Sequence, residues 1–233
     1  MPASIRSIPG NLSSSGLLQV YVVNVQNNFP IQNARVTITR SGEPSASPEQ
    51  LTTNASGQTG EVSLAAPPLE YSLRPDENRP YADYNITVEA PGFRPATIEG
   101  TEVLPEVTAI QPVRLEPESD SMPEENPIVI PEHTLYGSYP PKIAETEIQP
   151  VKESGEIVLS RVVVPQTIVV HDGPPTANAR DYYVPYRDYI KNVASSEIYA
   201  TWPQASITAN VLAIMSFTLN RVYTEWYRNQ GYD

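Results

Sequence analysis

The chain has 233 residues, and its 15 Lys and Arg against 27 Asp and Glu give a formal net charge of −12. This balance argues against a protein that binds polyanions, because a basic patch is the usual electrostatic signature of such binding. The absence of cysteine excludes disulfides and thiolate metal sites within this chain. The 25 prolines are about twice the usual share and indicate that part of the chain is a linker.

The N-terminal residues 1–15 are polar and lack the apolar core of a secretory signal. They are expected to form a flexible N-terminus. Elsewhere, no apolar run approaches the ~18 residues that a membrane span needs. The sequence therefore predicts neither a signal peptide nor a membrane span.

Residues 16–116 alternate apolar and polar side chains in short segments, most clearly in Ala34–Thr39 and Tyr84–Glu89. A period of two places one set of side chains in a core and the other in water. The pair Ser56-Gly57 marks a turn, since glycine permits a positive φ. The other expected strands are Leu18–Val25, Glu61–Leu64, Glu70–Leu73, Pro95–Glu99 and Ile110–Leu115. About seven short strands predict an antiparallel β-sandwich.

Residues 117–154 are rich in proline and acidic side chains, and we interpret them as a linker. The part 117–126 is expected to be extended, because it cannot bury enough apolar surface to offset its ordering entropy. The part 128–148 contains several apolar side chains. It either packs against a neighbouring part of the chain or serves as an inert spacer.

From residue 155 onward the composition changes again. The Val- and Ile-rich segments 156–164 and 167–170 predict two more strands. Eight of the 14 tyrosines lie after residue 180, as do both tryptophans. This enrichment fits a surface that stacks on saccharides, and it equally fits ordinary core and rim packing.

Two helices are expected next. The first runs from Asp188, a plausible N-cap, to Ile198. One face of it carries Ile190, Val193, Ala194 and Glu197. The second runs over residues 204–227, with a proline at position 203 just before it, and is apolar nearly all round near its middle. We expect this second helix to be buried.

Glu197 is the candidate catalytic residue. Helical spacing places its carboxylate on the apolar side of the first helix, where desolvation disfavours the charged form. A glutamic acid that keeps its proton near neutral pH can act as a general acid toward a glycosidic oxygen. Alternatively, Glu197 lies in the last helical turn, points to solvent and has no catalytic role.

The run Tyr189–Pro203, continued by Ile207–Ala213, resembles the start of the catalytic domain of the stage II sporulation protein D family. That pattern is a short helix that ends in a glutamate, an aromatic–proline pair and a long Ala-rich helix. Members of the family cleave peptidoglycan as lytic transglycosylases. From about Gly16 onward, the chain is similar to the precursors of clostridial spore cortex-lytic enzymes, with Phe217–Tyr227 as a second specific match.

The resemblance implies that Glu197 is catalytic. In a lytic transglycosylase one glutamate protonates the leaving oxygen and then takes the proton of the muramoyl 6-hydroxyl, whereas a hydrolase uses two carboxylates. Tyr199, Trp202 and Asn210 are the candidates for substrate contact. Relatives usually have Gln and Arg where this chain has Asn210 and Met215, so the resemblance transfers no polar role to these two positions.

The resemblance also implies a zymogen that acts in germination. Residues 16–116 are similar to a carboxypeptidase-regulatory-like module and would form the pro-domain. Residues 155–233 would be the first, largely helical part of an α+β catalytic domain, which continues further in the family, so this chain alone is expected to be weakly active or inactive. A subtilisin-like germination protease is expected to cut in the linker, at Gln149, Pro150 or Val151.

The implied partners are spore cortex peptidoglycan and that protease, with no nucleic acid. No cofactor is implied, and no metal is expected, because His171 and its neighbour Asp172 lack a third ligand at a fixed spacing. The implied location is the cortex and coat region of the spore, after synthesis in the mother cell. The alternative is a non-enzymatic spore-surface or cell-wall interaction protein that works through its sandwich.

Overall fold

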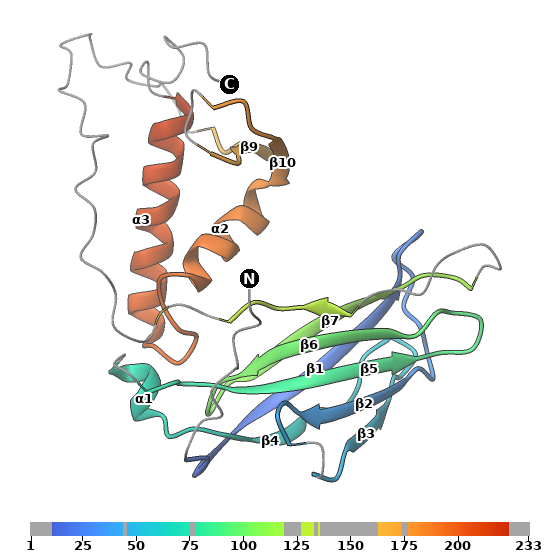
Figure 1. Cartoon of the computed structure of the whole chain (residues 1–233). Helices are drawn as coiled ribbons and strands as arrows, with labels where there is room; N and C mark the ends of the chain where they lie inside the picture. Colours follow the sequence, from blue (N-terminus) through green and yellow to red (C-terminus); the bar gives the residue numbers. More distant parts are fainter. Residues whose placement is uncertain are drawn as a thin grey trace, which may run out of the picture. The chain divides into compact units, whose positions relative to one another are not determined.

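The computed structural model describes residues 11–43, 46–74, 78–118, 127–132, 135, 163–173 and 177–223. The chain divides into two compact units, Met1–Ser138 and Tyr139–Asp233. The elements of the first unit are β1 (Ser14–Asn24), β2 (Arg35–Arg40), β3 (Glu49–Thr52), β4 (Val62–Ala66), α1 (Glu70–Leu73), β5 (Ala82–Glu89), β6 (Ala96–Val103), β7 (Thr108–Leu115) and β8 (Ile128–Val129) (Figure 1).

The strands of the first unit form two mixed sheets. One sheet has the order β4-β1-β7 and the other has the order β3-β2-β5-β6-β8. The pairs β1–β7 and β6–β8 are parallel, and the remaining pairs are antiparallel. The expectation of a wholly antiparallel arrangement is therefore wrong. The short connection 104–107 carries the chain from β6 to the other sheet, where β7 lies parallel to β1, and a longer connection brings β8 back beside β6.

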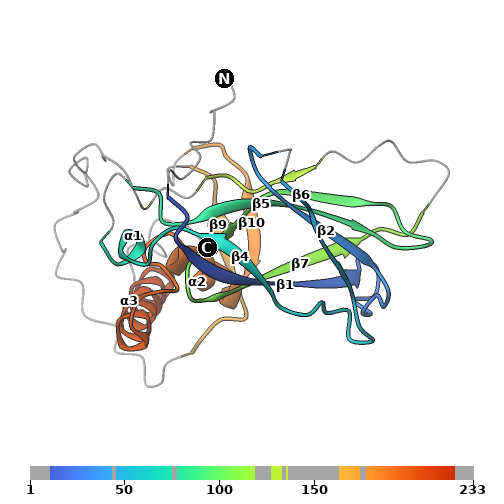
Figure 2. The ribbon, with the colours of Figure 1, turned by 90° about the horizontal axis from the view of Figure 1, so that it is seen from below.

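One hydrophobic core lies between the two sheets. The alternation along β1 buries Leu18, Val20 and Val22, and the alternation along β5 buries Ile86 and Val88. These side chains belong to a single cluster to which both sheets contribute, and Figure 2 shows β1 and β7 in one layer with β5 and β6 in the other. Each such buried side chain contributes roughly 1.5–3 kcal/mol of burial free energy. The alternation in the sequence therefore stabilises the unit because it places these side chains on the face of each sheet that is buried.

Thr53 ties the end of β3 to the start of β2 inside this core. Its hydroxyl donates to the carbonyl oxygen of Ile31 at 2.7 Å and accepts from the backbone N–H of Ala34 at 2.9 Å. Because Thr53 is buried, we expect Thr53→Val to lower the free energy of unfolding by about 1–3 kcal/mol, as two buried backbone groups lose their partner. Urea unfolding measures this. The matched Thr87→Val, which removes only a 3.5 Å contact with the hydroxyl of Thr97, is expected to cost less than half as much.

A buried ion pair lies where the chain enters β5. Arg79 and Asp83 bond to each other with side chains that are both only 5% exposed. The guanidinium also lies 4.6 Å from the centre of the Tyr81 ring, and Glu132 approaches it at 3.8 Å. Charges this deep in the unit are tolerated only because each has a partner.

The short strand β8 lies within the range 117–154 that the sequence suggests as a linker. It pairs with β6 through Ile98–Ile128 and Glu99–Val129, and the backbone N–H of Ile130 donates to the carbonyl oxygen of Glu99 at 2.8 Å. Ile130 also packs against the core cluster. Of the two alternatives for this part of the linker, packing against a neighbour is the one that residues 127–132 adopt.

One further local prediction is wrong, and one strand was missed. Residues Glu70–Leu73 form the helix α1 rather than a strand. The chain turns there after two prolines, and local hydrogen bonds hold the turn: the backbone N–H of Arg74 donates to Glu70 and the hydroxyl of Ser72 donates to Leu69. The strand β3 was not predicted, because its mostly exposed side chains show no alternation.

The second unit contains β9 (Thr167–His171), β10 (Asp181–Pro185), α2 (Tyr186–Ser195) and α3 (Gln204–Tyr223). The strand predicted over 167–170 is confirmed as β9. Of the strand predicted over 156–164, residues 156–162 lie outside the described residues, and residues 163 and 164 are not in a strand. The Tyr-rich passage supplies β10, which pairs antiparallel with β9 and leads directly into α2 (Figure 1).

Both helices differ in detail from their predictions. The helix α2 begins at Tyr186, after Pro185, so Asp188 lies inside the first turn rather than at the N-cap. The helix α3 is not buried: of its described residues only Ile214 and Thr218 are buried, while Leu212 and Phe217 are 57% and 59% exposed. An apolar pattern all round predicted burial, but only the face toward α2 is covered. Among the described residues no helix is both long and apolar enough to cross a membrane.

Candidate functional site

Glu197 lies in the turn that follows α2, not on the apolar face of the helix. The helix ends at Ser195, and the backbone tightens there: the N–H of Ser196 donates to the carbonyl oxygens of both Asn192 and Val193, and the N–H of Glu197 donates to that of Ala194. The hydroxyls of Ser195 and Ser196 also donate to the carbonyl oxygen of Asn192, at 2.9 and 3.0 Å. Bonds to the third residue before are typical of the last turn of a helix. The prediction that Glu197 is tucked among apolar neighbours is therefore wrong, because its side chain is exposed.

The Glu197 carboxylate is nevertheless held by a specific partner. The side-chain Nδ2 of Asn210, in α3, donates to Oε2 of Glu197 at 2.9 Å. Thirteen residues separate the two side chains, and the bend at residues 199–203 brings them together. Two residues that the sequence analysis named separately, one as catalytic and one as a substrate contact, therefore form a single hydrogen-bonded pair.

Asn210 has its two amide atoms in different environments. While Nδ2 reaches the exposed carboxylate, Oδ1 is buried and has no hydrogen-bond partner among the described residues. A buried acceptor without a donor costs about 1–3 kcal/mol of stability. Turning the amide over would not help, since the oxygen would then face a carboxylate. The geometry therefore fixes which end of the amide contacts Glu197.

The other two candidate substrate contacts lie in the bend between the helices. Tyr199 is only 3% exposed, so its ring packs inside the unit and offers no surface for stacking on a sugar. Trp202 is partly exposed, and its backbone N–H donates to the carbonyl oxygen of Tyr199 at 3.1 Å. Of the two rings, only Trp202 is therefore accessible to a ligand.

A small core joins α2 to α3. Tyr186 and Ile190 from α2 pack against Ile214 from α3, with Val211 and Met215 beside them. Burial, followed by the neighbouring phenols of Tyr189 and Tyr223, raises the pKa of the Tyr186 hydroxyl. Met215 thus has an apolar role in this core, and the packing positions the turn that carries Glu197 against α3.

The histidine that the sequence singled out pairs with a different aspartate. Nδ1 of His171 lies 2.7 Å from Oδ1 of Asp181, because the two residues face each other in the β9–β10 register. The sequence suggested its neighbour Asp172 instead, since β10 was not predicted and a cross-strand partner could not be found. No group of three His, Cys, Asp or Glu that could hold a metal ion occurs within the described ranges. His133, Gln149, Pro150 and Val151 lie outside the described residues.

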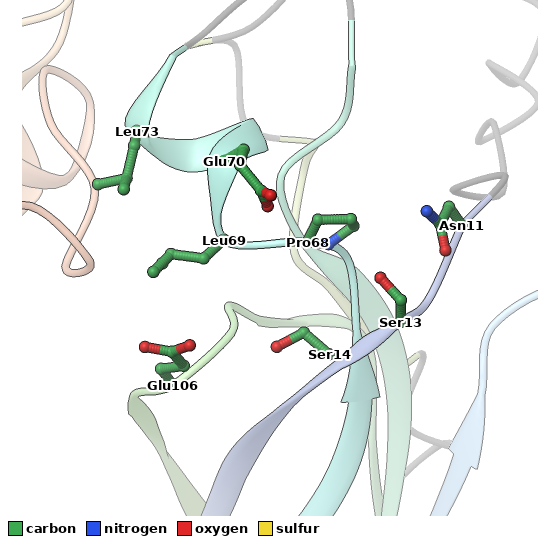
Figure 3. A pocket seen from close by; sticks show the side chains of 8 residues that line it. All are labelled: Asn11, Ser13, Ser14, Pro68, Leu69, Glu70, Leu73 and Glu106. Carbon is green, nitrogen blue, oxygen red and sulfur yellow. The ribbon is translucent and has the colours of Figure 1, made fainter.

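A shallow hollow of about 530 Å³ occurs in the first unit, beside α1 (Figure 3). Pro68 and Leu69 give it apolar lining, and Glu70 and Glu106 place carboxylates at its edge. Both carboxylates carry the same charge as the chain overall, and none of the described residues that line the hollow is cationic. Its chemistry therefore does not suggest a site for an acidic ligand.

Comparison with known proteins leaves the family open. No protein-family model matches the sequence, and no curated protein matches it either. Several solved structures match part of the chain, all with low TM-scores. Klebsiella pneumoniae 5-hydroxyisourate hydrolase has a TM-score of 0.30 and 23% identity, over 45% of this chain and 92% of the other.

Two further solved structures are similar to less than half of the chain. The Bacillus anthracis TIE protein has a TM-score of 0.31 and 15% identity, over 45% of this chain and 17% of the other. The Streptococcus agalactiae minor pilin GBS52 has a TM-score of 0.31 and 14% identity, over 48% of this chain and 49% of the other. The chain thus spans less than two thirds of the length of either protein.

Proposed function

We propose that this protein belongs to a spore cortex peptidoglycan-degrading system of the lytic transglycosylase type, with Glu197 as its general acid and base. The observation that carries the proposal is the hydrogen bond from Asn210 to Glu197. It joins the two stretches on which the resemblance to the sporulation protein D family depends.

The proposed chemistry needs one carboxyl group and no water. Glu197 gives its proton to the glycosidic oxygen as the bond from that oxygen to the muramoyl C1 breaks. The resulting carboxylate then takes the proton of the muramoyl 6-hydroxyl. At the same time the oxygen of that hydroxyl bonds to C1, which closes the 1,6-anhydro ring. The carboxyl group thus ends protonated, as it began, with the proton of the 6-hydroxyl in place of the one given to the leaving oxygen. Since the structure leaves Glu197 exposed, the shielding that favours its protonated form would come from the bound glycan itself.

In this proposal the first unit is the pro-region of a precursor. The strand β8 and the pairing of Glu132 with Arg79 attach residues 127–132 to the sandwich. A cut anywhere on the C-terminal side of these residues would therefore leave β8 with the sandwich. The proposed activating cut by a subtilisin-like protease, at residues 149–151, lies C-terminal to β8. The proposed location is the spore.

The decisive test is the substitution Glu197→Gln in the complete gene product after protease treatment. We expect wild-type protein to release anhydromuropeptides from purified spore cortex, detected by mass spectrometry. Glu197→Gln is expected to lower that release by at least about 10²-fold, because the amide cannot exchange the proton. Asp188→Asn is the matched control and should retain wild-type release. Asp188 is an exposed carboxylate on α2 whose one ion pair within the described residues is with Lys191, at 3.8 Å.

Two outcomes would contradict the enzymatic proposal. Release by Glu197→Gln at the wild-type rate would show that another group acts. Sedimentation of the protein with cortex peptidoglycan without any soluble product would instead favour the second candidate, a non-enzymatic wall-interaction protein. The exposure of Glu197 on the turn is the observation that favours this second candidate.

A further inference from the structure

We propose that Asn210 is a positioning residue for Glu197: its side-chain amide holds one carboxylate oxygen so that the other is presented to the glycan. This inference rests on the proposed function in its catalytic part. Its geometric part stands on the 2.9 Å bond between Nδ2 of Asn210 and Oε2 of Glu197. Within the described part of the chain, no other hydrogen bond is made to this carboxylate, so Oε1 is left for proton transfer.

The first argument concerns freedom of movement. Glu197 lies in a turn and is exposed, and a glutamate side chain with three rotatable bonds samples several rotamers when nothing holds it. Asn210 lies in the second turn of the 20-residue helix α3, which gives its amide a fixed place. A short polar side chain on a rigid helix can therefore restrict the carboxylate to one orientation. Correct orientation of a reacting group contributes a large share of enzymatic rate.

The second argument concerns the buried end of the same amide. Oδ1 of Asn210 is buried without a hydrogen-bond partner in the described residues, which is rare in native proteins and calls for an explanation. A leucine of similar size would remove this unpaired acceptor and would suit the apolar neighbours Val211 and Ile214. Stability alone therefore does not explain an asparagine here, whereas the orientation of Glu197 does.

The two arguments predict opposite changes in stability and activity. We expect Asn210→Leu to unfold at the same temperature as wild type or higher, while kcat for muropeptide release falls about 10–100-fold. KM should change less than about twofold, because Asn210 orients the carboxylate and does not bind the glycan. Asn210→Gln should recover most of kcat, since its longer amide still donates. The control Gln204→Leu, which removes an exposed amide from the same helix, should leave kcat unchanged.

A second measurement tests the contact without any activity. We expect the NMR signals of the side-chain amide protons of Asn210 to differ between wild type and Glu197→Ala. The same signals should not differ between wild type and Asp188→Ala. An unmoved signal would overturn the inference, as would Asn210→Leu with a lowered unfolding temperature and unchanged kcat. If the wild-type complete gene product releases nothing after protease treatment, the proposed function is refuted, and with it the catalytic part of this inference, even if the amide signal moves.

Discussion

Asp83→Ala should lower the free energy of unfolding of the first unit by about 3–5 kcal/mol. Asp83 and Arg79 are bonded to each other with side chains that are only 5% exposed, and removing one partner of such a pair leaves a buried charge without its compensation. Glu132 lies 3.8 Å from the guanidinium and Tyr81 faces it with its ring, so these two contacts compensate the charge less well than the direct bond to Asp83. Urea unfolding followed by circular dichroism measures the loss.

Two further variants show whether burial causes this loss. The double variant Arg79→Met with Asp83→Leu removes both charges, and it should cost clearly less than Asp83→Ala, because no uncompensated charge remains. Glu89→Ala breaks the Arg35–Glu89 pair, whose side chains are 68% and 53% exposed, and it should change stability by no more than about 1 kcal/mol. Equal losses in Asp83→Ala and Glu89→Ala would contradict the explanation.

The strands of the sandwich could be predicted from the sequence where one face of the strand is buried and the other is exposed to solvent. In β2 and β5 the apolar residues alternate because they pack on a single core, and the pattern carries that information. The strand β3 lacks the pattern because it lies at the edge of its sheet with mostly exposed side chains. The strand β8 is two residues long and forms through the backbone groups of β6, which no side-chain pattern reveals.

The contact between Glu197 and Asn210 could not be predicted from the sequence, because it depends on where the first helix ends. The spacing of apolar residues continued the first helix to Ile198, whereas the helix ends three residues earlier, at Ser195, where the backbone tightens into a turn. That difference moves Glu197 from a buried face to an exposed turn. Its contact with Asn210 depends on how the bend folds the chain back, and hydrophobic periodicity contains nothing about a bend.

Gly57→Ala should lower the free energy of unfolding by about 2–5 kcal/mol. Gly57 has φ +73, a left-handed conformation that costs a residue with a Cβ about 1–2 kcal/mol. The added Cβ would also lie 2.4 Å from the carbonyl oxygen of Val22. That oxygen belongs to the backbone of the central strand β1, and the Val22 N–H donates to the Gly57 carbonyl oxygen at 2.7 Å. Relief of the clash would therefore have to move the backbone of β1, which should lower the free energy of unfolding by about 1–3 kcal/mol more.

Two other glycines separate these contributions. Gly92 has φ +78 but open space around its Cβ position, so Gly92→Ala should show the conformational cost alone, about 1–2 kcal/mol. Gly60 has neither a positive φ nor a neighbour within 4 Å, and Gly60→Ala should be neutral or stabilise the fold by about 0.4–1 kcal/mol, because alanine restricts the unfolded chain. Thermal unfolding of the three variants should therefore rank Gly60→Ala above Gly92→Ala above Gly57→Ala. If Gly57→Ala and Gly92→Ala unfold at the same temperature, the approach to Val22 contributes nothing, and the turn rather than the sheet sets the requirement for glycine.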